Sequence, residues 1–191
     1  MSERFRISNL TIEGFRGINN KINIDLEGNA AVLFGPNGVG KSSVMQAIEW
    51  CLFGGLISAV VGAVEFKKED AIVNSFHPQK KATVEVILRG EKGKKVRVMR
   101  ERKLGRSTTT GKTELEIEVE GTEYFGDDAQ SRLNKLLKIT PMEFYASMYL
   151  HQEAIRDLIV GDPLLRSEII DKLLGLHFVR ALIDYLPIKH V

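Results

Sequence analysis

The sequence contains little cysteine and histidine, and it has no long apolar run. Cys51 is the only cysteine among 191 residues, which excludes a disulfide within the chain and makes a reducing cytosol the simplest compartment. The four histidines are scattered, and one cysteine cannot complete a zinc cluster with them. The longest apolar stretch, Leu52–Val64, is interrupted by three glycines, so no membrane span is expected. The first residues also lack the apolar core of a secretion signal.

A large excess of either charge is also lacking. The chain has 27 Lys and Arg against 25 Asp and Glu, a formal net charge of +2, which by itself argues neither for nor against nucleic acid as a partner. Hydrophobic residues make up 43% and charged residues 27% of the chain, a profile typical of a globular domain with one substantial core. Cys51 lies beside Leu52 in a helical pattern, so we expect it in that core and not as a reactive thiol.

What the chain has is a complete phosphate-binding motif. Residues Gly35–Ser42 read Gly-Pro-Asn-Gly-Val-Gly-Lys-Ser, which matches Gly, any four residues, then Gly-Lys-Ser/Thr. The apolar run Ala30–Phe34 predicts a buried parallel strand before the loop, and helical spacing predicts a helix over Ser42–Phe53 after it. Loop N–H groups and the helix N-terminus would then face a phosphate. Lys41 would contact the outer phosphates of ATP, and the Ser42 hydroxyl would bind Mg²⁺.

The segments around the loop are predicted to be mainly strands. Alternating apolar residues predict a strand ending near Gly14, a strand over Ile22–Leu26 and an antiparallel meander over residues 82–125. The segment Gly54–Lys81 is rich in glycine and charge, which predicts an irregular excursion. The expected organisation is a phosphate-loop core (1–55), the β-meander (82–125) and a helical segment (126–191).

The last third of the chain is predicted to be helical. Asp127 opens the first helix, and Thr140 with Glu143 forms a capping box at the start of the next one. Pro187 interrupts the last predicted helix, so an uninterrupted coiled coil from Phe178 is not expected.

Two blocks of motifs, Phe15–Gly54 and Tyr149–Leu176, give the chain a more specific resemblance. The first block has Phe-Arg-Gly at residues 15–17 ahead of the phosphate loop, and the second has Tyr-Leu-His-Gln at residues 149–152. In this order the motifs resemble the N-terminal half of the ATPase head of the SMC-like DNA repair ATPases, the Rad-fifty and SbcC family. The resemblance implies an α/β P-loop NTPase fold, an ABC-ATPase-like lobe with a mixed sheet, an antiparallel β-subdomain and a helical C-terminal segment.

The resemblance also implies which residues serve ATP and Mg²⁺. Gln152 would be the glutamine-loop residue that senses Mg²⁺ and the attacking water, although Glu153 follows it where the family commonly has glycine. Lys41 and Gln152 would act in catalysis, and Ser42 and Gln152 would reach the metal. Nucleotide-binding residues would be Arg16, Gly35, Asn37, Gly38, Gly40, Lys41, Ser42 and Ser43.

The same resemblance implies that the chain is half of an enzyme. The sequence contains neither an acidic Walker B pair nor a Ser-Gly-Gly signature, and phosphoryl transfer needs such groups beyond the phosphate cradle. We therefore expect a Mg²⁺-dependent ATPase when a C-terminal half completes the head, and an inactive isolated chain. The implied partners are that half, a second head joined through ATP, a nuclease and DNA, with no membrane. The implied location is the cytoplasm or nucleoid, or the nucleus of a eukaryote.

Three alternatives stay open on the sequence. A small P-loop kinase would use the same loop, and an ATP-gated clamp would use binding without turnover. The basic run Lys92–Arg106 either contacts DNA or pairs, through Lys95 and Arg97, with the acidic face of Glu114–Glu120 across neighbouring strands. Arg100 and Arg102 share the parity of Val96 and Val98, so we expect them either beyond the buried part of the strand or past a bulge.

Overall fold

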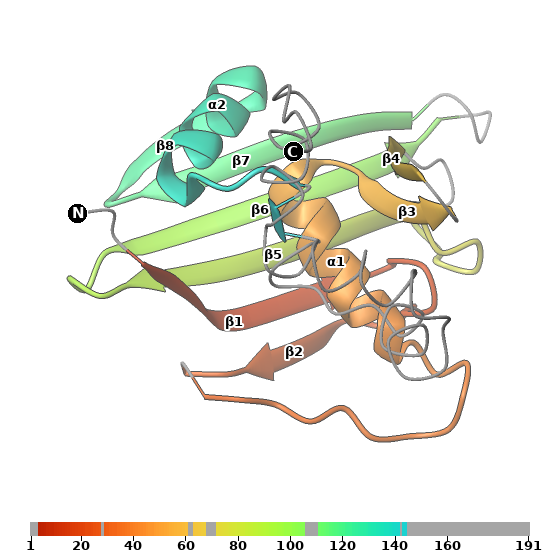
Figure 1. The fold of residues 1–191 in the computed structure, drawn as a ribbon. Helices are drawn as coiled ribbons and strands as arrows, with labels where there is room; N and C mark the ends of the chain where they lie inside the picture. The colour runs from red at the N-terminus through yellow and green to blue at the C-terminus, as the bar shows by residue number, and fades with distance from the viewer. Residues whose placement is uncertain are drawn as a thin grey trace, which may run out of the picture. The chain divides into compact units, whose positions relative to one another are not determined.

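A computed structural model of the chain describes residues 4–27, 29–60, 63–67, 72–105, 111–141 and 143–144. The chain divides into two compact units, Met1–Lys138 and Ile139–Val191. All of the helices and strands below belong to the first unit (Figure 1). They are β1 (Phe5–Glu13), β2 (Ile22–Asp25), α1 (Lys41–Phe53), β3 (Leu56–Val60), β4 (Ala63–Lys67), β5 (Lys81–Gly90), β6 (Lys95–Leu104), β7 (Gly111–Val119), β8 (Thr122–Phe125) and α2 (Gly126–Leu137).

The main sheet has six strands in the order β2-β1-β5-β6-β7-β8. Every neighbouring pair is antiparallel. The four strands from β5 to β8 follow one another through the sheet, which confirms the predicted meander. β1 joins this meander to the N-terminal hairpin, because it pairs with β2 on one side and β5 on the other.

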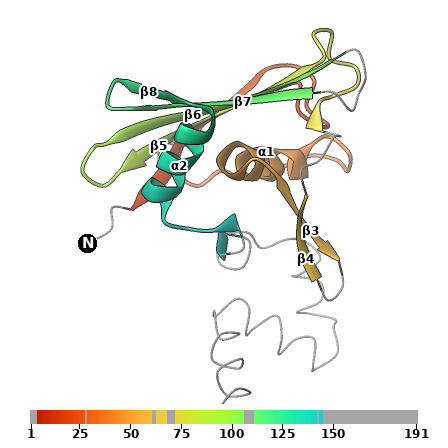
Figure 2. The same ribbon diagram turned by 90° about the horizontal axis from the view of Figure 1, so that it is seen from above.

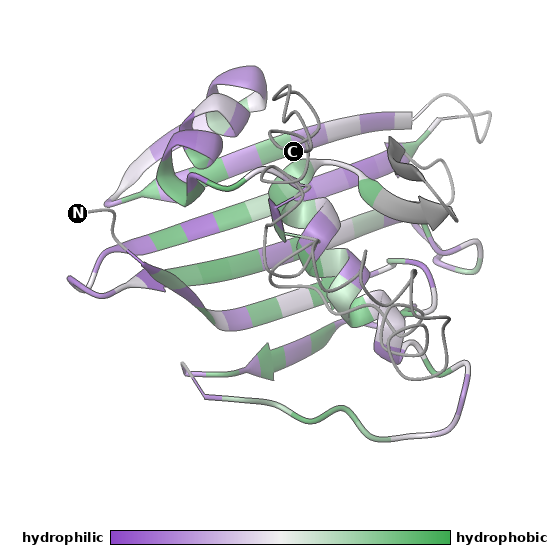
Figure 3. Cartoon of the chain, in the orientation of Figure 1, coloured by the Kyte–Doolittle hydropathy of each residue, from purple (hydrophilic) through white to green (hydrophobic). Residues whose placement is uncertain are grey.

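Both helices cover one face of this sheet (Figure 2). Along the central strands buried and less buried residues alternate, because successive side chains of a strand point to opposite faces. Hydrophobic and hydrophilic residues mix along the same strands (Figure 3). Phe15 and Trp50 pack with their ring centroids 5.5 Å apart. The largest fully buried apolar side chains of the sheet are Leu10, Ile12, Val84, Val86, Val96, Val98 and Ile117. Among the described residues, no helix is long and apolar enough to cross a membrane.

The opposite face of the sheet carries paired charges. Arg97 contacts Glu85 at 2.6 Å and Glu116 at 2.8 Å, and Lys81 contacts Glu101 at 3.0 Å. Burial opposes the ionisation of Glu101, but hydrogen bonds from Lys103, Lys81 and Thr83 outweigh it and lower the pKa of the carboxyl. Pairing across strands is therefore confirmed for Arg97, whereas no ion pair among the described residues involves Lys95.

The prediction for Gly54–Lys81 is wrong in one respect. β3 and β4 form a regular antiparallel hairpin in which Leu56 pairs with Lys67 and Val60 with Ala63. The charged residues that suggested irregularity do not prevent pairing, because backbone groups alone make the hydrogen bonds of a hairpin.

The prediction for Ala30–Phe34 is also wrong. These residues form no strand, and the exposed fractions of Val32 and Phe34 are 92% and 99%. A buried parallel strand needs neighbouring strands at its edges, and neither sheet of the described structure includes these residues. The apolar segment that leads into the phosphate loop is therefore uncovered.

The second unit is described only at its beginning. The Thr140 backbone N–H donates to Glu143 Oε2 at 2.7 Å, and the Glu143 N–H donates to Thr140 Oγ1 at 3.2 Å. These reciprocal bonds confirm the predicted capping box. The Thr140 N–H and the Thr140 hydroxyl both donate to Glu143 Oε2, and these two bonds lower the pKa of the Glu143 carboxyl.

Candidate functional site

The phosphate loop stands at the N-terminus of α1, as the motif predicts. Gly40 is the N-cap of α1 with φ 97°, and Gly38 has φ 85°. Nothing lies within 4 Å of a Cβ built on Gly38, so its backbone conformation, and not lack of space, explains glycine there. The left-handed turns bring the loop directly onto the first N–H groups of the helix, which have no partner within the helix.

Lys41 is the first residue of α1, and its side chain turns back over the loop. Its Nζ donates to the carbonyl oxygens of Gly35 at 2.8 Å and Pro36 at 2.6 Å. The ammonium charge therefore lies over the loop backbone. A phosphate on the loop would meet this charge as well as the helix N-terminus.

The two serines after Lys41 differ in their surroundings. Ser42 is exposed on the first turn of α1, where its hydroxyl can serve as a Mg²⁺ ligand. Ser43 is buried, and its Oγ accepts a hydrogen bond from Gly17 N–H at 3.4 Å. The structure therefore gives Ser43 a partner within the protein, and Ser42 fits the metal role. Asn37 is exposed on the loop. No group of three metal-binding side chains of the His, Cys, Asp or Glu type occurs among the described residues.

The turn Phe15-Arg16-Gly17 packs directly against the phosphate loop. A Cβ on Gly17 would lie 3.4 Å from the Cα of Gly40, so the two backbones approach closely without a side chain between them. Arg16 has φ 47°, an uncommon conformation for a residue other than glycine. The predicted position of Arg16 beside the nucleotide is compatible with this packing, and its contact with ATP stays a prediction.

The Arg16 turn is held in place by residues 72–74, for which the sequence predicted no such role. Arg16 N–H donates to Ile72 O at 2.8 Å, and Asn74 Nδ2 donates to Arg16 O at 2.5 Å. Phe15 also forms a bridge with Val73. Residues 72–74 therefore fix the Arg16 backbone next to the loop. The side-chain amide of Asn74, a common turn residue, was the only sequence signal for this role.

The far end of α1 is held by two side chains from other elements. Arg100 Nε of β6 donates to Cys51 O at 3.0 Å, and its Nη2 donates to Gln130 Oε1 at 2.6 Å. Gln130 of α2 in turn donates to Leu52 O at 3.1 Å. These donors meet carbonyl groups that have no partner within the helix, at the end where a cation is favourable.

Arg100 contradicts its prediction. From its parity with Val96 and Val98 we expected it beyond the buried part of the strand or past a bulge. The pairing of β6 with both neighbours continues without a shift, and Arg100 is only 6% exposed. Burial lowers the pKa of its guanidinium. The core tolerates this buried charge because the guanidinium donates to Cys51 O, at the end of α1, and to Gln130 Oε1.

Gln152, the other predicted catalytic residue, lies outside the described residues. So does the rest of the Tyr149–Leu176 block. The structure thus brings together the predicted residues of the phosphate loop and the Arg16 turn, and it leaves the glutamine loop as a prediction.

Comparison with known proteins identifies the family. A family model described as an AAA domain matches residues 9–180. The chain belongs to this AAA-domain family. The chain is 28% identical over 179 residues to Arcadin-4 of Pyrobaculum calidifontis, and this alignment covers 94% of the chain and 21% of that protein. It is also 41% identical over 46 residues to the chromosome partition protein Smc of Desulfitobacterium hafniense, covering 24% of this chain and 4% of that protein. The AAA domain thus spans about a fifth, or less, of these relatives.

A solved structure shows the same fold. It comes from work on the "Structural biochemistry of ATP-driven dimerization and DNA stimulated activation of SMC ATPases", and it aligns with a TM-score of 0.57 at 22% identity, covering 87% of this chain and 98% of that chain. The predicted fold class, a P-loop NTPase of the SMC ATPase type, is therefore confirmed.

Proposed function

We propose that this AAA domain is the ATP-binding half of an SMC-like ATPase head. The observation that carries the proposal is the loop at the start of α1, where the Lys41 ammonium lies over Gly35 and Pro36 and the Ser42 hydroxyl is exposed. Loop N–H groups, a fixed cation and a hydroxyl are the groups that hold the phosphates and Mg²⁺ of ATP in P-loop proteins. ATP is thus the cofactor that the site fits.

In this proposal a C-terminal half completes the head and covers the segment Ala30–Phe34. The support is the exposure of Val32 and Phe34 immediately before the loop, since large apolar side chains in such a position mark an interface. The completed head hydrolyses ATP with Mg²⁺, and Gln152 senses the metal and the attacking water. The isolated chain turns over little ATP because it lacks the carboxylate that would orient the water.

We further propose that ATP drives the association of two such heads in DNA double-strand-break repair or chromosome maintenance. The Rad-fifty and SbcC resemblance of the motifs supports the repair role, and the Smc relatives support the chromosome role. DNA and a nuclease are the partners proposed for the whole assembly, in the cytoplasm, on the nucleoid or in a nucleus.

Calorimetry of ATP binding in the presence of Mg²⁺ tests the phosphate-loop assignment. We expect Lys41→Ala to weaken ATP binding at least about tenfold, because hydrogen bonds to charged groups contribute about 1.5–3 kcal/mol. Lys21→Ala removes an equal charge at an exposed position between β1 and β2. We expect this variant to leave the affinity for ATP unchanged. Equal affinities of the wild type and Lys41→Ala would overturn the proposal.

A further inference from the structure

The phosphate loop contains the one Asn-Gly dipeptide of the chain, Asn37-Gly38. In such a dipeptide the backbone nitrogen of the glycine can attack the side-chain amide of the asparagine, because glycine has no side chain to obstruct the approach. Asn37 is exposed, and nothing lies within 4 Å of a Cβ built on Gly38. In the described part of the chain, neither the side-chain amide of Asn37 nor the N–H of Gly38 makes a hydrogen bond. The dipeptide therefore keeps the freedom that this reaction needs.

Asn74 offers a comparison within the same chain. It precedes Ser75, another small residue that obstructs such an attack little, but the structure holds its amide at both ends. Asn74 Nδ2 donates to Arg16 O at 2.5 Å, and Asn74 Oδ1 accepts a hydrogen bond from Phe76 N–H at 2.8 Å. The amide cannot turn toward the next backbone nitrogen without losing these bonds. The fold thus protects Asn74 and leaves Asn37 open.

The charges around the loop favour the reactive form of the Gly38 amide. The attacking nitrogen must first lose its proton, and positive charge nearby favours that loss. Lys41 Nζ lies over the loop, 2.8 Å from Gly35 O, and the N-terminus of α1 adds its partial positive charge. Residues 28–48 include no Asp or Glu, so no acid in the loop or its flanks offsets these charges.

We propose that Asn37 is a site of spontaneous deamidation, which converts the phosphate loop from an anion-binding site into an anionic one. The Gly38 nitrogen gives its proton to solvent and forms a bond to Cγ of Asn37. The Cγ–Nδ2 bond then breaks, and the nitrogen leaves as ammonia with a proton from solvent. Water opens the resulting succinimide ring at either carbonyl, which gives aspartate or isoaspartate. The net change is from amide and water to carboxylate and ammonium.

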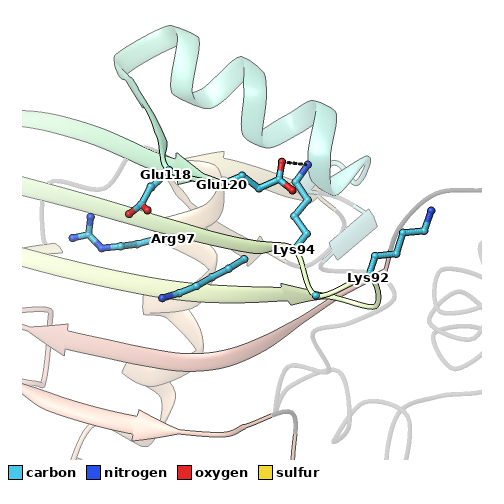
Figure 4. A pocket seen from close by; sticks show the side chains of 8 residues that line it. Lys92, Lys94, Arg97, Glu118 and Glu120 are labelled. Atoms are coloured by element: carbon cyan, nitrogen blue, oxygen red, sulfur yellow. Dashed lines mark ion pairs between the residues drawn. The ribbon is translucent and has the colours of Figure 1, made fainter.

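The new carboxylate opposes ATP on the loop where Lys41 favours it. Its negative charge would stand among the N–H groups that face a phosphate, and like charges a few Å apart repel. In the empty loop the carboxylate can pair with Lys41 instead. A comparable pair of a turn carboxylate and a lysine occurs beside a recess of about 360 Å³, where Glu120 lies 3.7 Å from Lys94 (Figure 4).

Bound ATP should protect Asn37, and this part of the inference rests on the proposed function. When a phosphate accepts hydrogen bonds from the loop, the Gly38 nitrogen keeps its proton and is no nucleophile. If only the nucleotide-free chain reacts, ATP at about 100 times its Kd slows the reaction about 100-fold. Deamidation would thus inactivate chains that have remained without nucleotide.

The test incubates the full chain at mildly alkaline pH with and without Mg²⁺ and ATP. Peptide mass spectrometry and labelling by an isoaspartyl methyltransferase follow each asparagine, and calorimetry follows ATP binding. We expect Asn37 to react first in the folded chain, Asn74 to react only after unfolding in denaturant, and ATP-binding capacity to fall in proportion to the modified fraction. Asn37→Asp should weaken ATP binding at least about tenfold. Asn37→Gln is the matched control, because its longer side chain does not form the five-membered ring, and its own affinity should not fall during incubation.

Four outcomes would overturn the proposal. They are an Asn37 that stays intact in the folded chain, an unchanged ATP affinity of Asn37→Asp, an equal loss of binding by Asn37→Gln during incubation, and equal rates with and without ATP in a chain that binds ATP. Deamidation is measured in the absence of ATP, so a stable Asn37 leaves the Lys41→Ala result untouched. Equal affinities of the wild type and Lys41→Ala would instead remove the protection by ATP while Asn37 still reacts.

Discussion

At the scale of single residues, the surroundings of Cys51 decide its chemistry. Its thiol donates to Val84 O at 3.4 Å and to Val98 O at 3.6 Å, beneath the sheet. Burial raises the pKa of the Cys51 thiol to about 12, although Arg100 acts in the opposite direction. The thiolate, which is the reactive form, is therefore almost absent at neutral pH.

We expect Cys51 in the native chain not to react with a chromogenic disulfide reagent at pH 8. Unfolding in denaturant should release the single thiol for full reaction, because the pKa returns to its ordinary value. The measurement is absorbance of the released chromophore with and without denaturant. Since the sequence has no other cysteine, the signal has one source. Fast reaction of the native chain would show that the end of α1 opens readily.

At the scale of elements, α1 is defined by contacts at both of its ends. The phosphate loop and the Gly17 turn meet at its beginning, and Arg100 with Gln130 binds the carbonyl groups at its end. A buried guanidinium is tolerated only where its donors find acceptors. In this way β6 and α2 fix the helix that carries Lys41 and Ser42.

We expect Arg100→Met to destabilise the chain by about 2–4 kcal/mol, since the change leaves Cys51 O and Gln130 without their donor. Arg89→Met on the neighbouring strand is exposed and should change the free energy of unfolding by less than about 0.5 kcal/mol. Urea unfolding followed by circular dichroism measures both. Equal effects of the two variants would mean that the Arg100 bonds contribute nothing specific.

Features set by neighbouring residues could be predicted from the sequence, whereas features set by contacts between distant residues could not. The phosphate loop, the two helices and the meander were predicted because their signals are local: glycine spacing, helical periodicity and alternation. Arg100 was misplaced because its partners are 49 and 30 residues away, and a sequence pattern does not show that a helix end will meet a strand. Ala30–Phe34 was misplaced because apolar content predicts burial without saying what supplies the cover.

At the scale of the whole molecule, the uncovered segment before the phosphate loop is the feature that most needs a partner. Val32 and Phe34 are almost fully exposed, and Leu33 is 42% exposed. Burying two such side chains would contribute about 3–6 kcal/mol to association. The proposed C-terminal half is the surface expected to cover them.

We expect V32S/F34S to leave the stability of the isolated chain within about 1 kcal/mol of wild type, because these side chains bury almost nothing in it. The same change should weaken association with a separately expressed C-terminal half about 100-fold or more. Phe76→Ser is the matched control, since Phe76 is 85% exposed and lies outside the segment. Thermal unfolding and titration calorimetry measure the two effects. Marked destabilisation of the isolated chain would show that the segment already has a packing partner.

The hydrogen bonds of Arg100 and Gln130 to the end of α1 also have a consequence for biosynthesis. The chain is made from its N-terminus, and the residues that complete α1 come late: Arg100 follows Cys51 by 49 positions, and Gln130 follows Leu52 by 78. At a synthesis rate of about 5–20 residues per second, several seconds pass between the emergence of the phosphate loop and that of its last support. A nascent chain thus carries the full nucleotide-binding motif before it has the structure that holds the motif in place.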